Sequence, residues 1–172
     1  TGMVMNAGIA GAHGEYVFKF DDDDLYGAHY VADRMICFCE FDIDALSNAH
    51  TFFRFGKQEK AYISNVAHNA VNNEVFSLGN TTYAMVKFTG CSVAMRRDYA
   101  RLVNFQEQAY AHADVSIIVK GIYLTSTAIY AQVPGFNVCV TREEKGHTWV
   151  ALSEEMMSYL DKHEFPLASV FV

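Results

Sequence analysis

Four consecutive aspartates are the residues of this sequence best suited to carry chemistry. Asp21, Asp22, Asp23 and Asp24 directly follow an apolar segment, residues 16–20, that predicts a buried strand. Carboxylates about 4 Å apart repel by about 1 kcal/mol in water, and a divalent cation would remove that repulsion. Oxygen ligands favour Mg²⁺, Mn²⁺ or Ca²⁺ over zinc. The alternative is a solvated acidic turn that caps the following helix.

Two further positions carry side chains of a suitable type. His147 and Trp149 end a polar, glycine-containing loop, where an imidazole can bind a metal and an indole can form an aromatic wall. A single loop histidine is, however, more often an ordinary surface residue. Asp114 lies at the start of an expected helix, where a carboxylate is usually an N-cap. Taken alone, neither position decides between structure and chemistry.

Strands and helices alternate in the hydrophobic pattern. It predicts helices at residues 3–13, 29–40, 92–102, 114–120 and 153–162, and strands at 16–20, 50–55, 83–88, 123–129 and 136–141. Residues 57–79 are polar and ambiguous. The alternation predicts an α/β layered fold, and 172 residues suit one domain, spanning 1–172, with a sizeable core.

Composition excludes several classes of protein. The net charge of -7 argues against binding to duplex nucleic acid, which requires clustered basic residues. No apolar run is long enough to cross a bilayer, so we expect no transmembrane segment. The C-x-C spacing of Cys37 and Cys39 fits neither a redox pair nor a common zinc site. We therefore expect reduced thiols and a cytoplasmic location, including a peripheral one at the inner face of the membrane.

Three passages, taken in order, resemble the bacterial family 2 type glycosyltransferases with a GT-A fold. The first is Asn6-Ala7-Gly8-Ile9 followed by G-E-Y and D-x-D-D-x-Y-G at residues 14–27. The second, residues 88–97, is similar to the family's acceptor-side segment, and the third is F-N…R…H-T-W at residues 136–149. Asp114 falls where the family has a Glu-Asp pair. The resemblance covers nearly the whole chain.

The resemblance implies a glycosyltransferase of the inverting type. It would move a sugar from a nucleotide-sugar donor to a saccharide or other hydroxyl acceptor, in surface polysaccharide synthesis. Asp21 and Asp23 would hold the donor's ribose and its Mn²⁺- or Mg²⁺-bound diphosphate, His147 would be a further metal ligand, and Asp114 the general base. The other implied site residues are Asp22, Asp24 and Tyr26 on the donor side, and Gly90, Arg96 and Trp149 on the acceptor side.

Two departures from the family pattern carry consequences. Ala113 replaces the family's Glu, so a carboxylate is missing beside the implied base. The chain also begins in the helix before the aspartates, so we expect an incomplete GT-A-like mixed sheet with flanking helices that lacks the N-terminal nucleotide-binding half. Such a fragment, truncated product or half-assembly would leave strand edges uncovered. We therefore expect a homo-oligomer or a partner chain that covers them; sedimentation as a monomer at micromolar concentration would contradict this.

Two other functions remain open at this point. One is a non-catalytic GT-A-derived binding or assembly module, which would keep the fold without affinity for the donor. The other is a calcium-stabilised acidic domain unrelated to sugars, which would bind Ca²⁺ whether or not a nucleotide is present.

Overall fold

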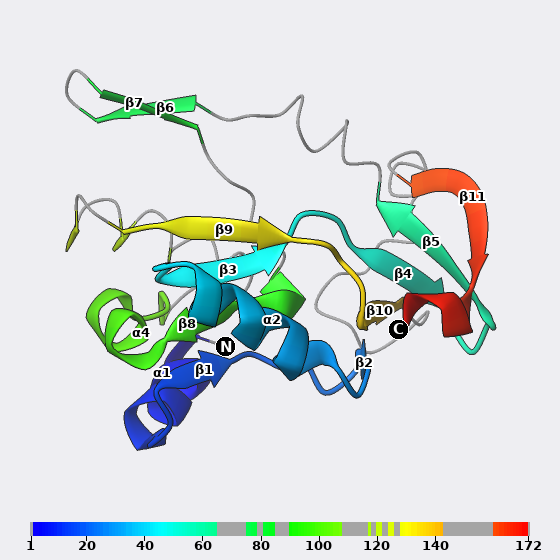
Figure 1. Cartoon of the computed structure of the whole chain (residues 1–172), viewed down its shortest axis with the longest axis horizontal. Helices are drawn as coiled ribbons and strands as arrows, with labels where there is room; N and C mark the ends of the chain where they lie inside the picture. Colours follow the sequence, from blue (N-terminus) through cyan, green and yellow to red (C-terminus); the bar gives the residue numbers. More distant parts are fainter. Residues whose placement is uncertain are drawn as a thin grey trace.

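The computed structural model describes residues 2–64, 75–78, 81–84, 90–107, 117, 120–121, 124–125, 128–142 and 160–171. Within this part, the chain is a mixed α/β fold with two mixed sheets, so the expected fold class is confirmed at that level (Figure 1). A separate two-stranded hairpin pairs β6 (Val75–Leu78) with β7 (Thr81–Ala84).

The first sheet has four strands in the order β1-β8-β3-β9. They are β1 (Tyr16–Phe18), β8 (Ala94–Arg96), β3 (Ala45–Asn48) and β9 (Tyr130–Val133). Because β8 is antiparallel to both β1 and β3, and β3 is parallel to β9, the strands β1, β3 and β9 run in one direction. We call the edge where these three strands end the carboxyl edge, and the other end of the same strands the opposite edge.

The second sheet has five strands in the order β11-β5-β4-β10-β2. They are β11 (Leu160–Pro166), β5 (Lys60–Ser64), β4 (Phe52–Phe55), β10 (Val138–Arg142) and β2 (Leu25–Tyr26). Only β4 and β10 are parallel neighbours.

Three short connections lead from the first sheet to the second. Residues 19–24 join β1 to β2, residues 49–51 join β3 to β4, and residues 134–137 join β9 to β10. All three leave the first sheet at the carboxyl edge, so the parallel pair β3–β9 continues as the parallel pair β4–β10 (Figure 1). We refer to these three connections as the inter-sheet junction. The four aspartates lie in it.

Helices cover both faces of the four-stranded sheet. They are α1 (Gly2–Gly11), α2 (Tyr30–Glu40) and α4 (Arg97–Val103). Successive strand residues point to opposite faces: Met95 packs in a core with residues of α1 and α4, whereas Ala94 packs in a core with Phe38 of α2. The α2 residues Tyr30, Arg34 and Phe38 are buried at intervals of four, which gives this helix one inward face.

The second sheet has its own smaller core. Phe52, Ala61 and Cys139 pack there against Leu167 and Val170 of the 3-10 helix η2 (Leu167–Val170). Burial raises the pKa of the Cys139 thiol to about 12. None of the four cysteines, all of which lie in the described part, forms a disulfide.

Several predicted elements are confirmed. The helices at 3–13 and 29–40 correspond to α1 and α2, and the strands at 16–20, 50–55 and 136–141 correspond to β1, β4 and β10. Of the strand predicted at 83–88, residues 83 and 84 belong to β7 and the rest lies outside the described residues. Ile117 and Lys120, from the predicted helix at 114–120, are helical.

Other predictions were wrong. Of the helix predicted at 92–102, residues 97–102 belong to α4, but Ala94–Arg96 is strand β8. Residues 124, 125, 128 and 129 are not in a strand; β9 begins only at Tyr130. Of the helix predicted at 153–162, residues 160–162 belong to strand β11 and residues 153–159 lie outside the described residues. For residues 94–96 and 160–162, pairing with neighbouring strands outweighed the local propensity.

Candidate functional site

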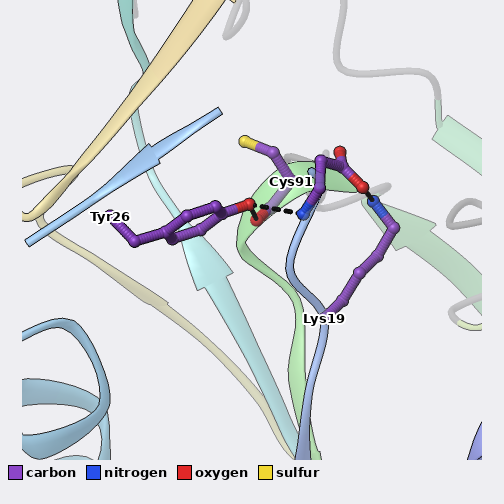
Figure 2. Close-up of polar contacts among 4 residues, drawn as sticks. Lys19, Tyr26 and Cys91 are labelled. Atoms are coloured by element: carbon purple, nitrogen blue, oxygen red, sulfur yellow. Dashed lines mark hydrogen bonds and ion pairs between the residues drawn. The ribbon is translucent and has the colours of Figure 1, made fainter. Parts of the chain in front are cut away.

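The acidic run forms a turn between β1 and β2, with its first aspartate anchored twice. The carboxylate of Asp21 forms an ion pair with the Lys19 ammonium group. The backbone N–H of Asp21 donates to the hydroxyl of Tyr26 over 2.8 Å, and this hydroxyl donates to the carbonyl oxygen of Cys91, also over 2.8 Å (Figure 2). Asp21 is therefore fixed at both its side chain and its backbone.

The last aspartate of the run is anchored to the other sheet. Oδ1 of Asp24 accepts the backbone N–H of Thr141 in β10 at 3.0 Å. The N–H of Asp24 also donates to the carbonyl of Asp21 at 3.3 Å, which closes the turn. Between these two anchors, Asp22 and Asp23 are exposed. The turn thus presents two carboxylates to solvent from a backbone held at each end.

An aromatic cluster of Phe20, Tyr26 and Tyr30 lies next to the turn. The ring of Tyr26 lies 4.7 Å from that of Phe20 and 4.9 Å from that of Tyr30, between ring centroids. Burial raises the pKa of both tyrosines. The Tyr26 hydroxyl therefore keeps its proton at neutral pH and remains a hydrogen-bond donor.

Gly90 lies at the same edge as the acidic turn. It begins the 3-10 helix η1 (Gly90–Ser92), which leads into β8. The bond from Tyr26 to Cys91, and one from the N–H of Lys19 to the carbonyl of Val93 at 2.9 Å, connect this segment to the acidic turn. The structure therefore brings Gly90 and the aspartates to the same edge of the sheet.

Arg96 lies at the opposite edge. It pairs in register with Tyr16, the first residue of β1, whereas the aspartates follow the last. Its Nε donates to the carbonyl of Ile43 at 2.8 Å, and its Nη2 pairs with Asp42 at 2.9 Å. The structure does not bring Arg96 together with the acidic turn.

Asn137 is a junction residue that belongs to the F-N passage of the family resemblance but was not predicted as a site residue. It adopts a left-handed backbone conformation, with φ of 62°, which asparagine tolerates better than most residues. Its side-chain N–H donates to Asp33 at 2.7 Å and its carbonyl accepts the N–H of Gly27 at 2.9 Å. A Cβ on Gly27 would lie 2.3 Å from the Asn137 Oδ1, so the close approach needs glycine there. These contacts fix the start of α2 to the residue that precedes β10.

Arg34 is a buried cation near the carboxyl edge, and only 1 % of its surface is exposed. Its guanidinium donates to the carbonyl of Tyr30 at 3.0 Å and to Oδ1 of Asn48 at the end of β3. It also lies 3.7 Å from the centre of the Tyr30 ring. Burial lowers the pKa of Arg34. An arginine on the apolar stripe of a predicted helix is the signal that sequence reasoning missed.

His50 occupies the second connection of the junction. Its Nε2 accepts the backbone N–H of Gly135 at 3.1 Å, and its ring packs edge-on against Phe52 and Phe136. Burial lowers the pKa of His50, which favours the neutral imidazole that this hydrogen bond requires.

No model of a known protein family matches this chain, and a search of curated proteins returns no match. The described helices also include none that is long and apolar enough to cross a membrane.

The described residues contain no ready-made metal site. Among them, no group of three or more His, Cys, Asp or Glu side chains is arranged to hold an ion. The exposed carboxylates of Asp22 and Asp23 have the oxygen chemistry that Mg²⁺ and Mn²⁺ prefer. The three remaining predicted site residues, Asp114, His147 and Trp149, lie outside the described residues.

Proposed function

We propose that this chain carries the metal-binding and acceptor-binding residues of a glycosyltransferase that moves a sugar from a nucleotide-sugar donor to a hydroxyl acceptor. The observation that carries the proposal is the acidic turn, in which Asp22 and Asp23 are exposed between two anchored aspartates. Exposed, closely spaced carboxylates repel one another, and a divalent cation with bound phosphates relieves that cost. The turn also follows a strand of an α/β sheet at its carboxyl end, where such sheets bind ligands.

The proposed roles follow from the chemistry of each group. Asp21 and Asp23 hold the donor and its Mn²⁺ or Mg²⁺, while Asp22 and Asp24 support them. The metal, when bound, offsets charge on the departing nucleoside diphosphate. Asp114 takes the proton of the acceptor hydroxyl as general base.

The position of β10 supports a role for His147 as a metal ligand. Thr141 in β10 contacts Asp24 directly, at 3.0 Å. His147 follows Thr141 by six residues, a length of chain that spans at most about 20 Å. The length of the chain therefore permits contact between this imidazole and the acidic turn.

Calorimetry with a nucleoside diphosphate and Mn²⁺ tests the proposal. The wild type should bind the nucleotide only when Mn²⁺ is present, and Asp23→Asn should weaken that binding by about 100-fold, as loss of a charged ligand costs a few kcal/mol. Asp98→Asn is the matched control, because Asp98 is 88 % exposed and lies at the opposite edge.

Two results would contradict the proposal. A wild type that binds no nucleoside diphosphate would favour the non-catalytic binding or assembly module. Binding of Ca²⁺ that does not depend on nucleotide would favour the calcium-stabilised domain.

A further inference from the structure

We propose that Tyr26 is a positioning residue of this site, whose hydroxyl holds Asp21 in register with the turn at residues 90–92. This inference rests on the proposed function. In this inference the tyrosine positions the backbone that carries the proposed metal-binding aspartates. The family resemblance implies a different role, a contact with the donor.

The hydroxyl uses both of its hydrogen-bonding capacities. It accepts the backbone N–H of Asp21 and donates its own proton to the carbonyl of Cys91, each over 2.8 Å (Figure 2). A phenolic oxygen can accept and donate at once, whereas a phenylalanine in its place can do neither. One atom therefore connects a segment of the acidic turn to a segment 70 residues further along the chain.

The tyrosine is itself held in place. Its backbone pairs with Val138 of β10, and its ring packs against Phe20 and Tyr30. The hydroxyl therefore lies at a position set by the second sheet and by the start of α2.

The bridge joins the two sides of the proposed site. Asp21 belongs to the donor and metal side, and residues 90–92 belong to the segment that resembles the family's acceptor side. The same segment is tied to β3 by the Ser92 hydroxyl, which accepts the N–H of Asn48 at 3.0 Å. A change at this point would thus alter the placement of the carboxylates relative to the acceptor side, without removing a carboxylate.

The variant Tyr26→Phe tests the inference, with Tyr62→Phe as the matched control. Tyr62 also loses one hydroxyl, which donates to Glu164 at 3.3 Å in the second sheet. Hydrogen exchange of the Asp21 amide, Mn²⁺-dependent binding of a nucleoside diphosphate, and the electron paramagnetic resonance spectrum of bound Mn²⁺ are measured on both. Thermal unfolding of both variants reports on stability.

We expect Tyr26→Phe to speed exchange at Asp21 at least tenfold, to weaken nucleotide binding about tenfold, and to change the Mn²⁺ spectrum. Tyr62→Phe should do none of these. A measurement on the wild type does not depend on whether a variant folds. There, the Asp21 amide should exchange at least tenfold more slowly than the amide of the exposed Asp22.

Unchanged exchange at Asp21 in Tyr26→Phe, or an unprotected Asp21 amide in the wild type, would overturn the inference. So would faster exchange together with unaltered nucleotide affinity and an unaltered Mn²⁺ spectrum. A wild type that binds neither Mn²⁺ nor nucleotide would refute the proposed function and the positioning role together. In that case, a protected Asp21 amide would show that the hydrogen-bond bridge is formed and that the failure lies in the proposed function.

Discussion

The charged residues at the two edges of the four-stranded sheet make different contacts. At the opposite edge, three arginines turn back onto the protein. Arg101 donates to the carbonyls of Ala10 and Ala12, at 3.3 and 3.2 Å, and so caps the last turn of α1. Arg97 donates to the carbonyl of His13 at 2.8 Å, and Arg96 to that of Ile43. These cations satisfy backbone groups that the ends of the elements leave open.

At the carboxyl edge, the contacts fix two aspartates and leave the two between them exposed. Lys19, Tyr26 and Thr141 hold the first and last aspartates, and the two between them are exposed. Charges at the opposite edge therefore bind backbone groups of the fold, while Asp22 and Asp23 at the carboxyl edge are exposed to solvent, where we propose that they bind a cation. The comparison separates residues that stabilise the sheet from residues proposed to act on a ligand.

Of the variants that test this comparison, Arg96→Met, at the opposite edge, is expected to have the largest effect. The change removes the bond to Ile43 and the pair with Asp42, and should lower the free energy of unfolding by about 2 kcal/mol, since hydrogen bonds to charged groups contribute about 1.5–3 kcal/mol. Most of this loss belongs to the carbonyl bond, because Asp42 is 96 % exposed and its pairing is weakened by solvent. Urea unfolding measures it, with Lys57→Met as a control for an exposed cation.

Nucleotide binding by Arg96→Met sharpens the same comparison. Unaltered binding would agree with a structural role. Lost binding with full stability would instead return Arg96 to the acceptor side, where the family resemblance puts it.

An intermediate effect is expected from Lys19→Met. The ammonium of Lys19 occupies the Asp21 carboxylate and so competes with an incoming cation. Removing the positive charge that pairs with the Asp21 carboxylate should raise the affinity for Mn²⁺ about three- to tenfold. Titration by electron paramagnetic resonance measures free Mn²⁺ directly.

The control for Lys19→Met is Lys60→Met, which changes the net charge equally but breaks an exposed pair with Glu164 in the other sheet. Equal gains in the two variants would show a long-range effect of net charge. A weaker Mn²⁺ affinity in Lys19→Met would mean that the lysine prepares the site for the ion, contrary to competition.

The smallest effect is expected at His50, in the junction. Because burial lowers its pKa below the ordinary value near 6.5, the unfolded chain binds the proton more readily than the folded one. The contribution of neutral His50 to the free energy of unfolding is complete above pH 6.5 and is lost as the pH falls toward the lower pKa of the folded state. His50→Gln keeps an acceptor for the Gly135 N–H without titrating, so its stability should fall less between pH 7.5 and 5.

Urea unfolding at several pH values compares His50→Gln with His13→Gln, which alters an exposed histidine. Parallel stability curves for the wild type and His50→Gln would rule out this contribution.

Sequence patterns predicted the elements whose ends carry clear signals. The apolar strand β1 stops at a run of aspartates, and α2 has apolar residues spaced for one buried face. By contrast, β3 was missed and β8 was predicted as helix. Both lie inside the sheet, and Leu46, Ala94 and Met95 are buried on its two faces, so the alternation of a half-exposed strand is absent.

The candidate site was predictable only where it is local. The location of the four aspartates after β1 follows from adjacent residues. Their anchoring does not, because Cys91 and Thr141 reach the turn only through the order of strands in two sheets. The opposite location of Arg96 depends likewise on the direction of β8, which the local sequence does not encode.

The inter-sheet junction has a mechanical consequence for the acidic turn. Through Tyr26 and Cys91, the backbone of Asp21 is tied to the segment that enters the first sheet, whereas Asp24 is tied to β10 of the second. The turn is therefore a short segment that connects the two sheets and is hydrogen-bonded to both sides. We therefore expect a twist of one sheet against the other to change the distances between the carboxylates, and with them the affinity of the proposed site for an ion.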